Sequence, residues 1–131
     1  MKYRKHEAKE YAKTVLKGVW TALPTNFTQE LALDEAANAA NLRYCIDELK
    51  IDGHYCLGNV GEFWSLTNEE RMSVHEINVD AADGRIPLIA GCHHQNPHEA
   101  AKLAEHARAV GIDFAIILTP YMGARDDDSV F

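Results

Sequence analysis

The residues best suited to chemistry form a short glycine-flanked stretch near the middle of the chain, Gly58-Asn59-Val60-Gly61-Glu62. Two glycines enclose two other residues, and an acidic residue follows at once. Such a turn exposes backbone N–H groups, which bind a carboxylate without the desolvation of a charged side chain. Glycine also lets the main chain come close to a ligand. The stretch is therefore a candidate carboxylate-binding site, although a turn that only connects two elements has the same pattern.

The flanking sequence places this turn between a strand and a helix. An apolar segment over 51–57 comes before it and predicts a strand. Thr67 and Glu70, which come after it, form a Thr-x-x-Glu capping box that predicts a helix over 67–82. Turns that lead from a strand into a helix are where α/β proteins bind ligands, so the position supports a functional role.

Strand and helix patterns alternate along the rest of the chain. An amphipathic helix is predicted over 1–17, which we treat as separate from residues 18–131. Strands are predicted over 19–23, 51–57, 86–91 and 113–119, and the helices between them over 34–49, 67–82 and 97–110. The continuous apolar run 113–119 predicts a strand buried on both faces, as in a parallel sheet. Repeated β-loop-α units indicate an α/β fold with right-handed crossovers.

Size and composition exclude several classes of protein. The chain has 131 residues, which is one domain at most, and 47% of them are hydrophobic, which is enough for a core. The net charge of -7 argues against binding to nucleic acid through its phosphates. Three cysteines without CxxC spacing, and no apolar run of membrane-spanning length, predict reduced thiols, no membrane association and a cytoplasmic location.

A second candidate for chemistry is the segment Cys92-His93-His94, with His98 close behind it. These residue types bind metal ions, and the segment follows a predicted strand. Neighbouring histidines in an extended stretch point to opposite faces, so both rarely bind one metal ion. We therefore predict no metal and no cofactor, with metal-dependent chemistry kept as an alternative. Cys56 is predicted to be an inert core thiol. The histidines His54, His75 and His106 lie inside predicted strands or helices and are predicted to be packing or surface residues.

Three segments carry a resemblance to a known family. The first segment is 17–27. The second is Gly58 to Glu62 together with the Leu-Thr and Glu-Glu-Arg residues that follow within 66–71. The third combines 87–91 with 115–121. Together they resemble the first four strands of the dihydrodipicolinate synthase and N-acetylneuraminate lyase superfamily, including its Gly-Thr-Thr-Gly-Glu signature. Members of that superfamily are class I, pyruvate-handling aldolases and dehydratases built on a TIM barrel.

The resemblance implies a fold, a site and a reaction. The fold would be a (β/α) TIM barrel, of which this chain supplies about four parallel strands with helices, a partial barrel preceded by an N-terminal helix. Gly58, Asn59, Val60 and Gly61 would bind the carboxylate of a keto acid such as pyruvate, and Tyr121 would be catalytic. The reaction would be that of a lyase acting through a Schiff base, in a homo-oligomer (a dimer or tetramer at full length).

Departures from the family pattern limit these implications. Asn59 stands where the family has a hydroxyl residue that relays protons, and Met122 where many members have a second tyrosine; neither side chain can relay protons. A TIM barrel takes about 250 residues, and the family's Schiff-base lysine lies beyond the matched segments. Lys50 and Lys102 are predicted to be solvated surface residues. We therefore expect this chain to be the N-terminal half of a lyase, to lack the Schiff-base lysine, and to be inactive on its own. The alternative is a non-catalytic half-barrel that binds a keto acid or assembles with another half.

Overall fold

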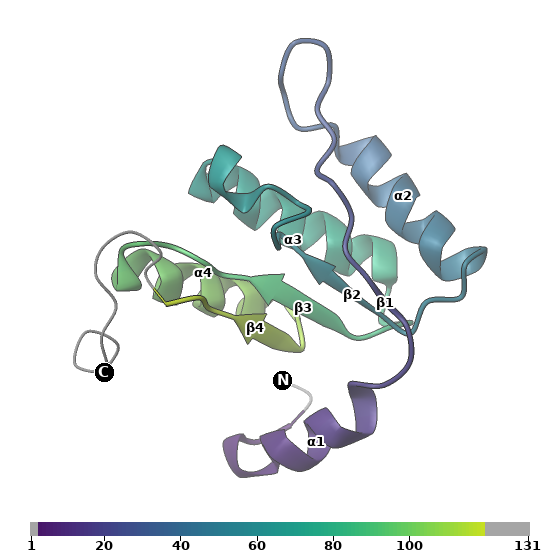
Figure 1. Cartoon of the computed structure of the whole chain (residues 1–131), viewed down its shortest axis with the longest axis vertical. Helices are drawn as coiled ribbons and strands as arrows, with labels where there is room; N and C mark the ends of the chain where they lie inside the picture. Colours follow the sequence, from purple (N-terminus) through teal and green to yellow (C-terminus); the bar gives the residue numbers. More distant parts are fainter. Residues whose placement is uncertain (1–2, 120–131) are drawn as a thin grey trace.

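The computed structural model describes residues 3–119, which are built around a four-stranded parallel sheet (Figure 1). The strands lie side by side in chain order, β1 (Trp20–Thr21), β2 (Gly53–Cys56), β3 (Leu88–Gly91) and β4 (Phe114–Ile116). All three strand pairs are parallel, which confirms the predicted α/β fold. Each strand is shorter than its apolar run, because the ladder covers only the residues that have a partner on the neighbouring strand.

Three helices connect the strands, α2 (Glu35–Asp47), α3 (Asn68–Ala82) and α4 (Pro97–Val110) (Figure 1). Their ends follow the predicted signals: the Asp34 side chain accepts from the Ala37 N–H, and the Asn96 side chain caps α4. Gly111 ends α4 with a φ of 104°, a conformation that favours glycine. The predicted helices are therefore confirmed within a few residues.

The sheet has an outer face, which packs against the helices, and an inner face opposite to it. Alternate residues of β2 show the two faces: Cys56 belongs to the core cluster between sheet and helices, while Tyr55 points the other way. In the ladder Tyr55 pairs with Ile89, and Ile89 pairs with Phe114, so these three residues share the inner face. In a closed barrel this face would surround the barrel axis.

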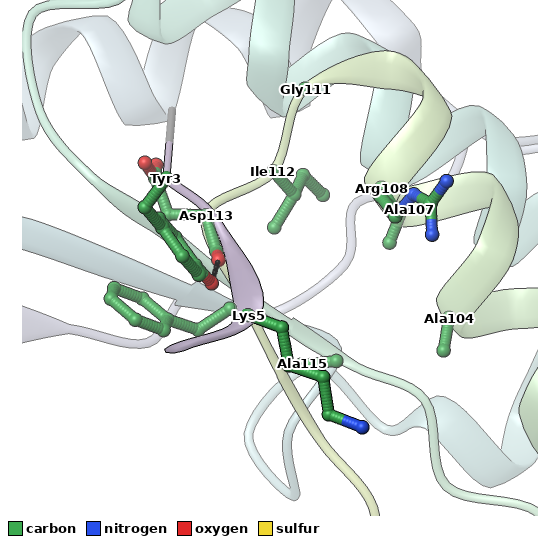
Figure 2. A pocket seen from close by; sticks show the side chains of 10 residues that line it. Tyr3, Lys5, Ala104, Ala107, Arg108, Gly111, Ile112, Asp113 and Ala115 are labelled. Carbon is green, nitrogen blue, oxygen red and sulfur yellow. Dashed lines mark hydrogen bonds between the residues drawn. The ribbon is translucent and has the colours of Figure 1, made fainter. Parts of the chain in front are cut away.

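The N-terminal segment lies on this inner face near the start of β4. It consists of η1 (Lys5–Glu7) and α1 (Ala8–Val15), so the helical part begins later than predicted. The Tyr3 ring stacks on Phe114 with centroids 5.9 Å apart, and the Tyr11 ring lies tilted against Phe114 with centroids 5.7 Å apart. The Tyr3 hydroxyl donates to the carbonyl oxygen of Asp113 at 2.6 Å (Figure 2). The Tyr11 hydroxyl donates to the Asp113 carboxylate at 2.8 Å. These contacts tie the segment to the sheet.

A cavity of about 680 Å³ lies beside that junction (Figure 2). It is bounded by Lys5 of the N-terminal segment, by Ala104 and Arg108 of α4, and by Ala115 of β4. Residues 58–61 do not line it, so it is separate from the candidate carboxylate site.

The prediction that the fourth strand is buried on both faces was wrong. β4 covers only Phe114–Ile116, and the side chains of Ile116, Ile117 and Leu118 are 37%, 53% and 42% exposed. The physical reason is position: β4 is the last strand in the sheet order and has a neighbour on one side only. The predicted acidic helix start over 126–129 lies outside the described residues.

Cys45, Cys56 and Cys92 are all free and buried. Burial raises the pKa of the Cys56 thiol to about 12, which agrees with the prediction of an inert core thiol. Within residues 3–119, no helix is long and apolar enough to cross a membrane.

Candidate functional site

The chain turns sharply between the end of β2 and the start of α3. Leu57 and Glu62 both adopt left-handed backbone conformations, with φ angles of 57° and 50°. The Glu62 N–H donates to the Asn59 carbonyl at 3.1 Å, which closes the turn. A short helix, η2 (Phe63–Ser65), then leads to α3, where the predicted Thr67–Glu70 capping box is present. The turn is thus anchored at both ends by regular structure.

The two glycines of the turn are required by space. A Cβ atom on Gly58 would lie 2.4 Å from Cε1 of Tyr55, and one on Gly61 would lie 3.1 Å from the Leu57 Cα. Neither glycine has a positive φ. The Thr25 hydroxyl also donates to the Gly61 carbonyl at 2.8 Å, which joins the loop after β1 to the turn. Close packing therefore explains both glycines.

The backbone N–H groups at the centre of the turn belong to exposed residues, Asn59 and Val60, whereas the flanking Gly58 and Gly61 are buried. Those of residues 58–61 donate no hydrogen bond to any residue within the described part of the chain. Asn59 is exposed, and the Val60 side chain is 51% exposed. Backbone N–H groups at the carboxyl end of a parallel strand carry partial positive charge, which suits a carboxylate.

Arg71, the last residue of the Glu-Glu-Arg motif, contacts residues on both sides of the turn. Its side chain is 2% exposed, and its Nη2 donates to the Gly91 carbonyl at 3.1 Å. The guanidinium lies over the Phe63 ring, 5.5 Å from its centroid. Gly91 in turn touches the turn: a Cβ there would lie 2.0 Å from the Leu57 carbonyl oxygen. Arg71 therefore holds the ends of β3 and η2 together.

Tyr55 and His93 form a polar pair next to the turn. The Tyr55 hydroxyl lies 2.7 Å from His93 Nε2, and the backbone N–H of Leu118 donates to His93 Nδ1 at 3.1 Å. Because Nδ1 accepts a hydrogen bond, the ring proton is on Nε2, which donates to the Tyr55 oxygen. Burial, followed by the Arg71 guanidinium, lowers the pKa of His93, which favours this neutral form. Burial is also the main cause that raises the pKa of Tyr55.

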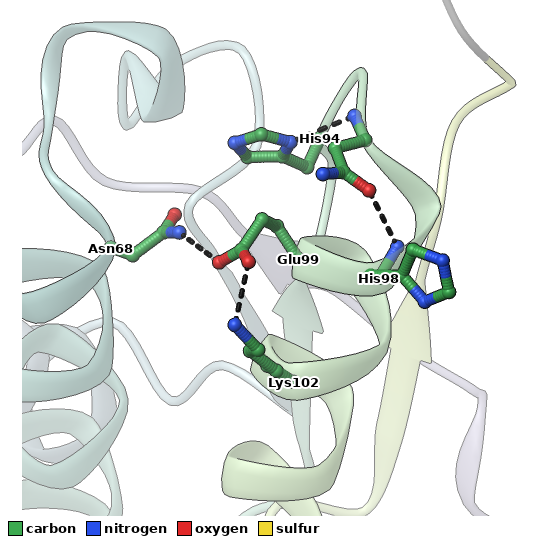
Figure 3. A network of polar contacts seen from close by, with 6 residues as sticks. Asn68, His94, His98, Glu99 and Lys102 are labelled. Carbon is green, nitrogen blue, oxygen red and sulfur yellow. Dashed lines mark hydrogen bonds and ion pairs between the residues drawn. The ribbon is translucent and has the colours of Figure 1, made fainter.

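The loop after β3 is held by a separate network (Figure 3). His94 Nδ1 accepts from the backbone N–H of Asn96 at 2.9 Å, and the Asn96 side chain accepts from the backbone N–H of His98. Glu99 of α4 accepts from the side chain of Asn68, the first residue of α3, at 2.9 Å. These bonds give the loop a structural role and place the starts of α3 and α4 side by side.

His93 and His94 point to different surroundings, as predicted for neighbouring residues. His93 is buried against Tyr55, whereas His94 is half-buried and bonds its own loop. Among the residues that the structure describes, no group of three or more His, Cys, Asp or Glu side chains could hold a metal ion.

The predicted site residues divide into two groups. Gly58, Asn59, Val60 and Gly61 lie together in one turn at the carboxyl end of β2, whereas Tyr121 lies outside the described residues. The sequence prediction missed the pairing of Tyr55 with His93. Strand alternation could have placed Tyr55 on the inner face, but nothing in the sequence connects it with a residue 38 positions later.

The same architecture occurs in solved enzymes, which defines the class of fold. The chain matches N-acetylneuraminate lyase from Mycoplasma synoviae with a TM-score of 0.85 and 29% identity, over 89% of this chain and 40% of that chain. It matches YagE, a prophage protein of E. coli K12 in complex with pyruvate, with a TM-score of 0.82 and 29% identity, over 88% of this chain and 39% of that chain. The fold is a partial TIM barrel.

Sequence comparison then identifies the family. The chain is 40% identical to 4-hydroxy-tetrahydrodipicolinate synthase from Brucella abortus over 107 residues, which is 82% of this chain and 36% of the relative. It is 34% identical to N-acetylneuraminate lyase from Histophilus somni over 106 residues, 81% of this chain and 36% of the relative. Residues 15–128 match the dihydrodipicolinate synthetase family, and the chain belongs to that family. It spans just over a third of the length of these relatives.

Proposed function

We propose that this chain carries the carboxylate-binding site of a pyruvate-dependent lyase, and that residues 58–61 bind the carboxylate of the keto acid. The observation that carries the proposal is the run of unused backbone N–H groups in this turn. Family membership supports it, as do the lyase names of the relatives and the neighbour in complex with pyruvate. In this proposal residues 18–131 are the N-terminal half of an aldolase-like barrel, and residues 1–17 precede it as a separate segment, whose helical part is η1 and α1.

The chemistry of the turn suits a small keto acid. A carboxylate needs several hydrogen-bond donors, and backbone N–H groups supply them at fixed positions with no side-chain entropy to lose. The inner face beside the turn carries the Tyr55 side chain, whose hydroxyl could meet a carbonyl group next to the carboxylate. By family match, Tyr121 would serve the same site.

Schiff-base chemistry needs a lysine whose amine is nucleophilic near neutral pH. All the lysines that the structure describes, Lys50 and Lys102 among them, are exposed, and Lys102 forms an ion pair with Glu99 at 2.7 Å. We therefore expect the isolated chain to form no covalent adduct when it is incubated with pyruvate and borohydride. Intact-protein mass spectrometry reads this directly, and a trapped adduct on any lysine would contradict the expectation.

The binding proposal is tested with a matched pair of variants. Val60→Pro removes one N–H donor of the turn, whereas Val60→Ala shortens the same exposed side chain and keeps the donor. A hydrogen bond to a charged group is worth about 1.5–3 kcal/mol, so we expect the Pro variant to weaken pyruvate binding about tenfold or more. The Ala variant should bind like the parent. Equal affinities in all three proteins, or no binding by the parent, would refute the proposal.

A second candidate is a half-barrel whose binding depends on assembly. The exposed apolar residues Ile116, Ile117 and Leu118 favour it, because an apolar edge strand is a template for pairing with another chain. Size-exclusion chromatography with light scattering tests this candidate. An assembly larger than 14.6 kDa supports it, and a monomer across the concentration range contradicts it.

A further inference from the structure

The inner face of the sheet presents a hydroxyl group directly beside the 58–61 turn. Tyr55 is the third residue of β2, and its ring occupies the space that a side chain on Gly58 would need. Its neighbours His54 and Cys56 point to the helices: His54 hydrogen-bonds the Thr21 carbonyl, and Cys56 lies in the core. Tyr55 therefore projects onto the face that would surround the axis of a barrel.

The hydroxyl is held by residues from two other strands. His93 follows β3 and Leu118 follows β4, and they form a chain from the Leu118 N–H through His93 to the Tyr55 oxygen, with lengths of 3.1 and 2.7 Å. Since His93 receives a hydrogen bond on Nδ1, it can only donate through Nε2. The Tyr55 oxygen thus accepts from His93, and its own proton is directed elsewhere.

Neither side chain at the centre of the turn supplies a hydroxyl group, because these residues are Asn59 and Val60. A keto acid such as pyruvate has a carbonyl group on the carbon next to its carboxylate, and the oxygen of this group accepts hydrogen bonds. A neutral phenol is a suitable donor to it, since a phenol hydrogen bond adds no net charge to the partly enclosed inner face.

We propose that Tyr55 donates a hydrogen bond to the carbonyl oxygen of a keto acid bound at the 58–61 turn, and that His93 is the positioning residue that aims the Tyr55 hydroxyl. This inference rests on the proposed function, because it requires the carboxylate to be bound by the turn. Tyr55 distinguishes a keto acid from a simple carboxylic acid. No proton is transferred: the phenol keeps its proton, and His93 stays neutral.

The test compares pyruvate with propionate, which has the same carboxylate and chain length but no carbonyl oxygen at the second carbon. Tyr55→Phe removes the hydroxyl and keeps the ring against Gly58. Tyr11→Phe is the matched control, because it removes the same atom near the opposite end of the strands, where the hydroxyl bonds Asp113. Ligand-observed NMR titration of the full chain measures all affinities.

We expect the parent to prefer pyruvate, and Tyr55→Phe to weaken pyruvate binding about fivefold while propionate binding is unchanged. His93→Leu should reduce the same preference, and Tyr11→Phe should keep it. Long-range ¹H–¹⁵N spectra should show the His93 proton on Nε2 in the parent and in Tyr55→Phe, because the Leu118 N–H imposes it.

The contradicting outcomes are distinguishable. If the parent binds pyruvate and Tyr55→Phe binds it equally well, the role of Tyr55 is refuted and the carboxylate site stands. If Tyr55→Phe loses pyruvate and propionate affinity to the same extent, Tyr55 only supports the turn and the inference is again refuted. If the parent binds neither acid, both the inference and the proposed function are wrong.

Discussion

The stability of the fold should depend on pH through one buried histidine of α3. His75 is 0% exposed, and its ring stacks on that of His106 with centroids 6.0 Å apart. Neither ring nitrogen has a hydrogen-bond partner among residues 3–119. Burial, and after it the charges of His106 and Arg71, lower the pKa of His75 from 6.5 to about 3. The folded chain therefore keeps His75 neutral at every pH above about 3.

The sign and size of the effect follow from the unfolded state. Below its ordinary pKa of 6.5, His75 takes up a proton in the unfolded chain but not in the folded chain, so acid favours unfolding. One pKa unit corresponds to about 1.4 kcal/mol. Between pH 8 and pH 5 the free energy of unfolding should therefore fall by about 2 kcal/mol because of His75 alone.

His75→Leu removes this contribution and also removes two buried nitrogens without partners. We expect it to raise the free energy of unfolding at pH 8 by about 1 kcal/mol, and to reduce the fall between pH 8 and pH 5 by about 2 kcal/mol. Urea unfolding followed by circular dichroism at several pH values measures both quantities. Met72→Leu, a change on the same helix that titrates nothing, should run parallel to the parent. A His75→Leu curve parallel to the parent would refute the reasoning.

Three further predictions concern the structure around the turn, and urea unfolding or pyruvate titration measures each. Gly91→Ala should lower the free energy of unfolding by about 2 kcal/mol or more, because its Cβ would lie 2.0 Å from the Leu57 carbonyl oxygen. Gly84→Ala is the control: it has open space around it and a φ of 68°, and it should lower the free energy of unfolding by about 1 kcal/mol. Equal costs would contradict this account of Gly91. Thr67→Ala removes the capping box of α3 and should cost about 1 kcal/mol; an unchanged midpoint would show that the cap is dispensable. Gly58→Ala should displace the Tyr55 ring and weaken pyruvate binding, and unchanged affinity would contradict the packing described for the pair.

Local signals in the sequence predicted most of the helices and their ends. Local contacts explain this success. The Thr67–Glu70 box, Asp34 and Asn96 act through residues two or three positions away, and Gly111 acts through a single φ angle, so a short window contains the information. The α/β fold with parallel strands followed from the alternation of strands and helices.

Features that depend on distant neighbours could not be predicted in the same way. The apolar run 113–119 has the composition of a central strand, but β4 lies at the edge of the sheet, so its last residues are exposed. The 58–61 turn was identified as a candidate site, yet the need for Gly58 comes from the Tyr55 ring. The Tyr55–His93 pair depends on the register of β2 and β3, which only the folded structure defines.

The most direct test of the carboxylate site is a titration of the uniformly ¹⁵N-labelled chain with pyruvate, followed by ¹H–¹⁵N correlation spectra. We expect the backbone amide signals of residues 58–61 to shift together with saturation, because their N–H groups would donate to the bound carboxylate. The signals of Gly84 and Gly111, which lie in other turns, should not move. Saturable shifts that leave residues 58–61 unaffected, or no shifts at all, would contradict the account.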